Sequence, residues 1–277
     1  LKSMMWLLDP RPNLTTITDM VEKGFELSEA SNTPVMMELR IRACHVQGKF
    51  ATKNNRAPAL STRNPMERPA DFLYERLAHP PAIFPQEKKK SAVRLPAARK
   101  FIAERKLNEI FEGSESSVGL IVQGGLFNNV IRALQMLGLA DNFGGCRIPI
   151  LALNVVYPLV PEEITAFCAG KSAVLMIEEG QPEFIEQDIA TTLRRADIQT
   201  KLHGKDMLPM AGDYNTEVLV RALARFLAQH APQLDTSPGT RWLEGVEASR
   251  SRAAQVLGTL PQRPPTFCIG CPERPVF

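Results

Sequence analysis

From residue 113 to residue 232, short apolar runs alternate with segments of helical periodicity, and this alternation constrains the fold more than any other feature. The runs are almost continuously apolar, which predicts strands buried on both faces. Such strands, alternating with helices, are typical of a parallel sheet with helices on both faces. We therefore predict an α/β domain over 113–232 that folds by itself. The predicted strands are 117–123, 148–155, 173–177 and, more weakly, 199–203; the predicted helices are 128–139, 161–169, 183–195 and 216–229.

The region before this domain has the character of the end of another α/β unit. Apolar residues at helical spacing predict a helix over 14–30, with Asn13 or Thr15 as its cap. Alternation of apolar and mostly polar residues predicts a strand over 35–42, with its buried face formed by Val35, Met37, Leu39 and Ile41. We therefore expect residues 1–62 to be the C-terminal end of an α/β domain that begins upstream.

Two further stretches have the composition of linkers. Residues 63–112 are interrupted by prolines, which block regular structure, until a basic amphipathic helix predicted over 95–111. The run 88–90 consists of lysines and favours a solvated linker over an anion or nucleic-acid patch, because no aromatic residues interleave to stack on bases. Residues 233–277 form a second linker, with a short helix expected over 243–257, followed by the start of a further domain.

The composition narrows the class of protein. The chain has 277 residues, of which 44% are hydrophobic and 23% charged, as in ordinary globular domains. A net charge of +3 gives no indication of nucleic acid or a membrane surface as partner. We see neither a signal segment nor an apolar stretch of the roughly 18 to 20 residues that a membrane span needs. The five cysteines are mostly widely spaced, which favours a reducing, cytoplasmic setting with thiols or cofactor ligands instead of disulfides.

Both ends have the character of internal sequence. The chain starts at Leu1 without methionine and stops at Phe277, shortly after a Cys-x-x-Cys pair. We therefore expect an internal piece of a longer protein.

Three short motifs lie where parallel sheets place ligands or interfaces. Gln123–Leu126 follows a predicted strand and carries two glycines, which favours a tight turn over a phosphate loop because a Walker lysine is missing. Gly212-Asp213 with Asn215 resembles a thiamine magnesium motif only faintly, and a helix cap is the favoured interpretation. Glu178–Gly180 ends a predicted strand; a structural or interface role is favoured over a ligand site.

Most cysteines and histidines give no metal-binding pattern. Cys44 and His45 lie beyond a predicted strand without partners at metal spacing, so a satisfied polar histidine is favoured. Cys146 and Cys168 are expected to be ordinary small buried residues.

The pair Cys268-x-x-Cys271 is different, because its spacing lets two thiolates reach one metal or one cluster iron. A redox dithiol or chance occurrence are the alternatives. A thioredoxin-type pair belongs between a strand and a helix, whereas this pair follows Arg263-Pro264-Pro265.

Three stretches, in this order, resemble the indolepyruvate (arylpyruvate) ferredoxin oxidoreductases. Residues 33–42 (TPVMMELRIR) resemble the end of their pyrimidine-binding domain. Residues 157–161 (YPLVP) and 174–186, with LMIEEGQP, resemble their transketolase C-terminal-like domain. Residues 267–274 (FCIGCPER) resemble the opening of their diphosphate-binding domain.

This resemblance implies an activity. Members of the family oxidatively decarboxylate a 2-oxoacid on thiamine diphosphate held by Mg²⁺, reduce ferredoxin through [4Fe–4S] clusters and release an acyl-coenzyme A. It implies that Cys268 and Cys271 are cluster ligands and that Glu273 lies close to the cofactor. Pro272 stands where related enzymes have glycine, and many indolepyruvate enzymes carry histidine in place of Glu273.

The resemblance also implies that the central domain packs a dimer and carries no catalytic residue. The glutamate that activates thiamine and the magnesium motif are not in this chain, so we expect it alone to bind no cofactor and to be inactive. A partner subunit or fused domain is expected. The alternatives are a transketolase-like or 2-oxoacid dehydrogenase subunit without ferredoxin, which iron content would separate, and an interaction module without catalysis.

Overall fold

The computed structural model describes residues 4–54, 79–143 and 145–259. The chain divides into two compact units, residues 1–239 and residues 240–277. In the second unit the described residues are helical as far as Leu257, as the continuation of α9 (Ser237–Leu257). The first unit contains both sheets.

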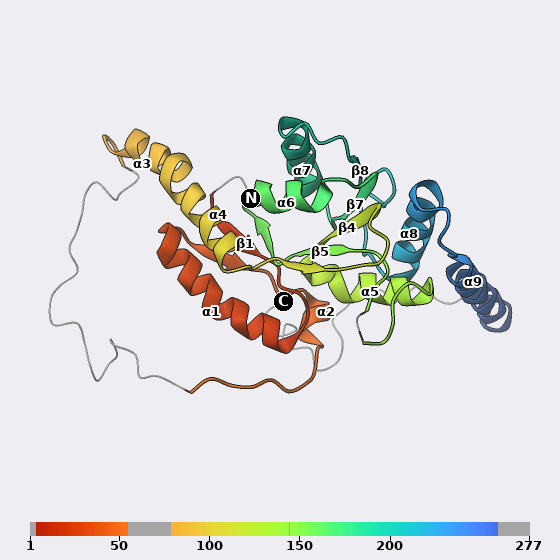
Figure 1. Ribbon diagram of the computed structural model, residues 1–277. Helices are drawn as coiled ribbons and strands as arrows, with labels where there is room; N and C mark the ends of the chain where they lie inside the picture. Colours follow the sequence, from red (N-terminus) through yellow and green to blue (C-terminus); the bar gives the residue numbers. More distant parts are fainter. Residues whose placement is uncertain (1–3, 55–78, 144, 260–277) are drawn as a thin grey trace. The chain divides into compact units, whose positions relative to one another are not determined.

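The main sheet has five strands in the order β3-β5-β4-β7-β8 (Figure 1). Neighbouring strands among β5, β4, β7 and β8 are parallel, and β3 pairs antiparallel with β5 at the edge. The predicted fold class, an α/β domain with a parallel sheet, is confirmed. The strands are β3 (Glu109–Phe111), β4 (Val118–Gln123), β5 (Ile150–Leu153), β7 (Ala173–Ile177) and β8 (Lys201–His203).

Helices cover both faces of this sheet (Figure 1). On one side α6 (Pro161–Cys168) packs against α7 (Phe184–Arg195), and on the other α5 (Phe127–Met136) packs against α8 (Thr216–His230). Each helix lies within a few residues of its predicted range. Pro161 occupies the first turn of α6, where its missing N–H costs nothing.

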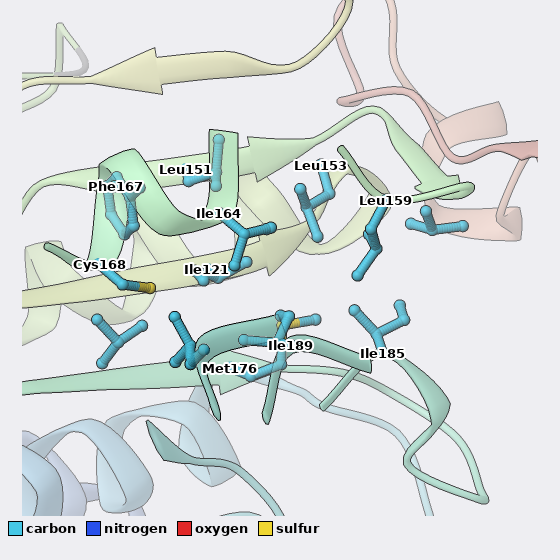
Figure 2. Packing of buried hydrophobic residues seen from close by; sticks show 13 residues of the cluster. Ile121, Leu151, Leu153, Leu159, Ile164, Phe167, Cys168, Met176, Ile185 and Ile189 are labelled. Carbon is cyan, nitrogen blue, oxygen red and sulfur yellow. The ribbon is translucent and has the colours of Figure 1, made fainter. Parts of the chain in front are cut away.

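The core between the sheet and helices α6 and α7 is continuous (Figure 2). Strands β4, β5 and β7 are buried along their whole length, as their unbroken apolar runs predict. The cluster includes Ile121, Leu151 and Met176 from the sheet and Ile164, Phe167, Ile185 and Ile189 from the helices.

A second, three-stranded sheet has the order β2-β1-β6. Strands β1 (Trp6–Leu8) and β2 (Val35–Met37) are parallel and joined through α1 (Leu14–Ser31), whereas β6 (Val155–Tyr157) pairs antiparallel with β1. Two strands from before residue 40, β1 and β2, therefore share one sheet with β6, which follows β5 of the main sheet.

The strand predicted over 35–42 is shorter than expected. It ends at Met37, because its partner β1 offers only three residues for pairing, and α2 (Ile41–Cys44) begins soon after. Leu39 and Ile41, expected on the buried face, are 48% and 78% exposed.

Helix α1 was predicted correctly, and the side chain of Asn13 caps it by accepting a hydrogen bond from the Thr16 N–H. Its buried face is formed by Met20, Gly24, Leu27 and Ser31, while Val21 and Phe25 are exposed. Gly24 faces β1 and β2, and a Cβ there would be in ordinary contact with Leu8, at 3.4 Å.

The region expected to be a linker is largely helical from residue 83. Helix α3 (Ile83–Lys89) continues through a π-helical turn (Lys90–Arg94) into α4 (Leu95–Glu104). The helix predicted over 95–111 stops at Glu104, and Lys106 adopts a positive φ of 50°. The chain then turns into β3, because pairing of 109–111 with β5 outweighs the helical periodicity of the sequence.

The buried amide of Asn154 joins the two sheets. Its side chain donates to the Leu107 carbonyl (2.9 Å) and to Glu109 (3.0 Å), and it accepts from the Arg11 N–H (2.8 Å).

None of the helices in the described part of the chain has both the length and the apolar character that a membrane-spanning helix needs.

Strand β7, which is buried along its whole length, should contribute strongly to stability. Met176→Ala removes a fully buried side chain and should lower the free energy of unfolding by about 2–5 kcal/mol, measured by denaturant titration. Phe143→Ala, at a side chain that is 98% exposed, is the control and should change it by less than about 0.5 kcal/mol. Equal effects of the two substitutions would contradict the core assignment.

Candidate functional site

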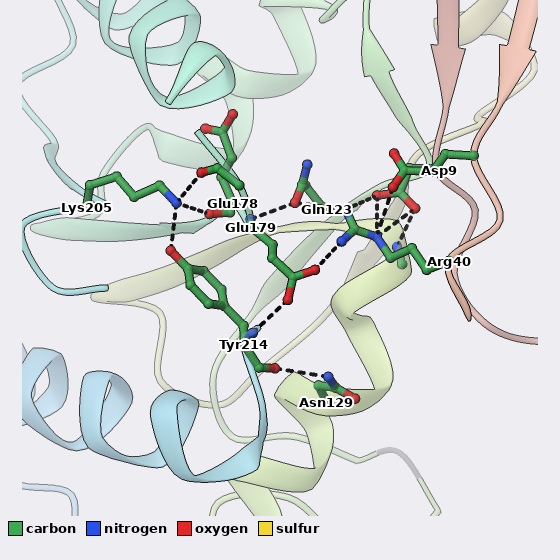
Figure 3. A network of polar contacts seen from close by, with 11 residues as sticks. Asp9, Arg40, Gln123, Asn129, Glu178, Glu179, Lys205 and Tyr214 are labelled. Carbon is green, nitrogen blue, oxygen red and sulfur yellow. Dashed lines mark hydrogen bonds and ion pairs between the residues drawn. The ribbon is translucent and has the colours of Figure 1, made fainter. Parts of the chain in front are cut away.

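Polar side chains gather beyond the carboxyl ends of β4 and β7, where open parallel sheets place ligands (Figure 3). Gln123 ends β4, and Glu178 and Glu179 follow β7 directly. Asp9 arrives from the end of β1, and Arg40 from the loop after β2. The geometry of this cluster decides whether it can be a reactive site.

The guanidinium of Arg40 lies at the centre of the cluster, with a side chain only 12% exposed. It contacts Asp9 at 3.0 Å and Glu179 at 2.5 Å. It also donates to the side-chain oxygen of Gln123 at 3.1 Å. The same oxygen accepts the Glu179 N–H at 2.8 Å, so the Gln123 side chain connects the end of β4 to the residues after β7.

Asp9 is 1% exposed and accepts the Gly125 N–H at 3.1 Å in addition to its contacts with Arg40. Burial raises the pKa of Asp9 to about 6, and it outweighs the opposing effects of Arg40 and Gly125. The ion pair is therefore held in place against a considerable desolvation cost.

The two glycines after β4 make room for this aspartate. A Cβ on Gly124 would lie 2.0 Å from the Asp9 carbonyl oxygen, and one on Gly125 would lie 2.4 Å from its carboxylate. The predicted tight turn is confirmed. A phosphate loop is disfavoured, because the Asp9 carboxylate already takes the Gly125 N–H.

The two adjacent glutamates after β7 serve different partners. Glu178 accepts the N–H groups of Ile185 and Glu186 at 3.0 Å each, and so caps the start of α7. Burial raises its pKa, against the effect of these hydrogen bonds. Glu179 binds Arg40 and accepts the Tyr214 N–H at 2.6 Å. The expected structural role of this pair is supported.

Lys205 closes the network on the other side. Its ammonium donates to the carbonyls of Glu178 (2.6 Å) and Gly180 (2.7 Å) and contacts the Tyr214 hydroxyl at 2.7 Å. The Tyr214 hydroxyl donates to the Pro209 carbonyl at 2.5 Å. Burial lowers the pKa of Lys205, and burial together with the nearby glutamates raises that of Tyr214.

Each charged group of the cluster thus has a protein partner. A nucleophile or general base needs a reactive atom that can turn toward a substrate, and these atoms hold neighbouring elements together instead. The arrangement fits a brace between strand ends, helix α7 and the segment before α8.

The other motifs are placed as follows. Asn215 caps α8 by accepting the Val218 N–H at 3.0 Å, as predicted. Cys168 is buried, and burial raises the pKa of its thiol to about 12. Cys146 is half-buried, and Cys44 and His45 are exposed.

Cys268, Cys271 and Glu273 lie outside the residues that the structure describes. Across 4–54, 79–143 and 145–259, no group of three or more His, Cys, Asp or Glu side chains could hold a metal ion.

Sequence reasoning missed Asp9, Arg40 and Lys205 as members of the cluster. Asp9 directly follows the apolar run of β1, which is the position that placed Glu178 and Glu179 among the candidates. Strand β1 has only three residues, too few for periodicity to mark it.

Comparison with known proteins identifies relatives. Residues 107–233 match the family model of the indolepyruvate ferredoxin oxidoreductase middle domain. The indolepyruvate oxidoreductase subunit IorA of Methanothermobacter thermautotrophicus is 27% identical, with 94% of this chain and 37% of the relative covered. IorA of Methanothermobacter marburgensis is also 27% identical, with 98% and 39% covered, and that of Pyrococcus abyssi is 26% identical, with 94% and 37% covered.

A solved structure, 2-oxoglutarate:ferredoxin oxidoreductase from Magnetococcus marinus with 2-oxoglutarate, coenzyme A and succinyl-CoA bound, is similar with a TM-score of 0.45 and 15% identity. The match covers 80% of this chain and 42% of that one. The chain spans 37–39% of the IorA relatives' length. The chain is thus similar to the indolepyruvate ferredoxin oxidoreductases, and the resemblance predicted from the sequence is confirmed.

The buried carboxyl of Asp9 should make stability depend on pH. Its native pKa of about 6 exceeds the ordinary 3.8, so its stabilising contribution is complete below about pH 3.8 and is lost as pH rises through about 6. Between these limits the unfolding free energy of the parent, relative to Asp9→Asn, should fall by about 2–3 kcal/mol.

Denaturant titrations at a series of pH values measure this difference. The control is Asp19→Asn, at an aspartate whose side chain is 55% exposed. It should give a curve parallel to that of the parent. Parallel curves for the parent and Asp9→Asn would show that Asp9 is not the titrating group.

Proposed function

We propose that this chain forms part of an indolepyruvate-type 2-oxoacid:ferredoxin oxidoreductase. The match of residues 107–233 to the middle-domain family and the similarity to IorA subunits over 94% of the chain support this. The reaction proposed for the whole enzyme is oxidative decarboxylation of indolepyruvate or another 2-oxoacid to an acyl-coenzyme A, with reduction of ferredoxin. We place the enzyme in the cytoplasm, with a partner subunit or fused domain, and as a dimer.

Within that enzyme the described region acts as a brace. The observation that carries this role is the Arg40 guanidinium, which holds Asp9, Gln123 and Glu179 together in one buried cluster. Side chains engaged in this way fix the relative positions of strand ends and expose no reactive group. By this proposal the chain alone neither binds thiamine diphosphate appreciably nor turns over a 2-oxoacid.

We propose the following division of the chain. Residues 1–62 are the end of a pyrimidine-binding domain, 63–112 connect it to the middle domain over 113–232, and 233–277 lead into a diphosphate-binding domain. In this division β1 of the first segment, which also pairs with β2, braces the middle domain through pairing with β6.

Cys268 and Cys271 are proposed as ligands of a [4Fe–4S] cluster, with Glu273 near the thiamine cofactor. Two thiolates separated by two residues fit half of the four-thiolate set that such a cluster needs, and the intervening glycine permits the tight turn. When bound, thiamine diphosphate with Mg²⁺ supplies an electron sink for decarboxylation, and the cluster supplies a carrier for single electrons. The chain's own contribution is to supply these thiolates at a domain entrance, a few residues after the prolines at 261, 264 and 265.

Iron analysis of the enzyme that contains this sequence tests the proposal. Cys268→Ala and Cys271→Ala should each lower the iron content and abolish ferredoxin reduction, while part of the decarboxylation survives because that step occurs on thiamine. Cys44→Ala, at an exposed cysteine, is the matched control and should keep both. Full iron content and electron transfer in either of the first two variants would refute the cluster role, and an iron-free parent would favour a thiamine enzyme without ferredoxin.

A further inference from the structure

Two histidines meet at the edge of the main sheet, outside the brace around Arg40. His203 ends β8 and is 4% exposed, and His230 is the last residue of α8. Their Nε2 atoms lie 2.9 Å apart. The sequence gives no indication of the pair, since 27 positions separate the two residues.

A carboxylate fixes the ring of His203. The Asp206 carboxylate contacts His203 Nδ1 at 2.5 Å, and its other oxygen accepts the Gly204 N–H at 2.8 Å. Nδ1 therefore carries the proton, and the lone pair of His203 Nε2 faces His230. Metal-binding histidines commonly have this arrangement, in which a carboxylate on one ring nitrogen orients the other toward the ion.

The two rings also lie close together. Their planes are inclined by 48° and their centroids are 4.7 Å apart. Two imidazole nitrogens at about 2.0–2.1 Å from one ion, at angles of about 90–110°, lie about 2.9–3.4 Å apart. The observed Nε2 separation falls at the short end of this range, so the two nitrogens are close enough to bind one ion once the rings turn their lone pairs toward it.

We propose that His203 and His230 form a two-histidine site for a borderline divalent cation such as Zn²⁺, with Asp206 as the residue that positions His203. In the metal-free pair, His230 donates its Nε2–H to His203. On binding, His230 carries that proton on Nδ1 instead, so both Nε2 lone pairs reach the ion. Since the described residues offer no third His, Cys, Asp or Glu ligand, water completes the coordination from the partly exposed side of His230.

The surrounding charges bear on this site from several elements. Burial, His203 and Lys201 lower the pKa of His230, and Asp206 opposes them. His230 is therefore favoured as the neutral imidazole that binds metals. Lys201 on β8 repels a dication, while the Asp206 carboxylate attracts it. Arg225 on α8 holds the Asp206 carbonyl at 2.6 Å and so keeps the carboxylate's loop in place.

Zinc titration by calorimetry tests the site, at neutral pH and in a Cys268→Ala/Cys271→Ala background that removes competing thiolates. The 277-residue chain should bind one Zn²⁺. His203→Gln and His230→Gln should each weaken binding about tenfold or more, and Asp206→Asn by about 10- to 100-fold. His45→Gln, at an exposed histidine, should leave the affinity unchanged.

Imidazole ¹⁵N resonances of the parent chain give a second readout that does not depend on how the variants fold. Zinc should shift the Nε2 resonances of His203 and His230 together and leave His203 protonated at Nδ1. No binding, the same affinity in His230→Gln, or a shift confined to His45 or His79 would overturn the proposal. The pair would then be an ordinary hydrogen bond between imidazoles.

Discussion

The burial of the Arg40 guanidinium is the constraint on which the arrangement around the strand ends depends. A charge that is withdrawn from water must be paired and hydrogen-bonded, or it costs several kcal/mol. Its partners arrive from three separate places, namely Asp9 after β1, Gln123 at the end of β4 and Glu179 after β7. Arg40 therefore links the three-stranded sheet to the main sheet. Asn154, which bonds Arg11 and Glu109 and lies between β5 and β6, is a second link.

The space beyond the ends of β4 and β7 is thus occupied by the protein's own side chains. The space in which a parallel sheet commonly holds a ligand is taken by Asp9, for which Gly124 and Gly125 leave room. Glu178 and Glu179 turn to different partners, one to the start of α7 and one to Arg40. This arrangement agrees with the bracing role that we propose.

The sequence predicts the elements of the domain over 113–232 well. It predicts poorly the elements that connect this domain to the N-terminal part of the chain. Unbroken apolar runs identified β4, β5 and β7, and periodicity identified the four helices that cover the sheet, because burial dictates both patterns. Strands β1 and β3 escaped notice, since three residues are too few to show a period. The strand predicted to reach 42 and the helix predicted to reach 111 were too long, because pairing with distant segments ends them earlier.

The candidate site was recognised only in part. The glutamates and glycines were identifiable, because each directly follows a strong strand. Arg40 was assigned to a strand, and its partner Glu179 lies 139 positions away, a separation at which no local pattern reports contact. The histidine pair was missed for the same reason.

A double-mutant cycle on Arg40 and Glu179 tests the bracing account most directly. Arg40→Met, Glu179→Gln and the double variant keep the packing volume and the acceptor for the Tyr214 N–H. Denaturant titration gives the free energy of unfolding of each. We predict a coupling energy of about 1–3 kcal/mol between the two side chains. Effects that add within about 0.5 kcal/mol would contradict the central claim, because the two residues would then not hold the sheets together.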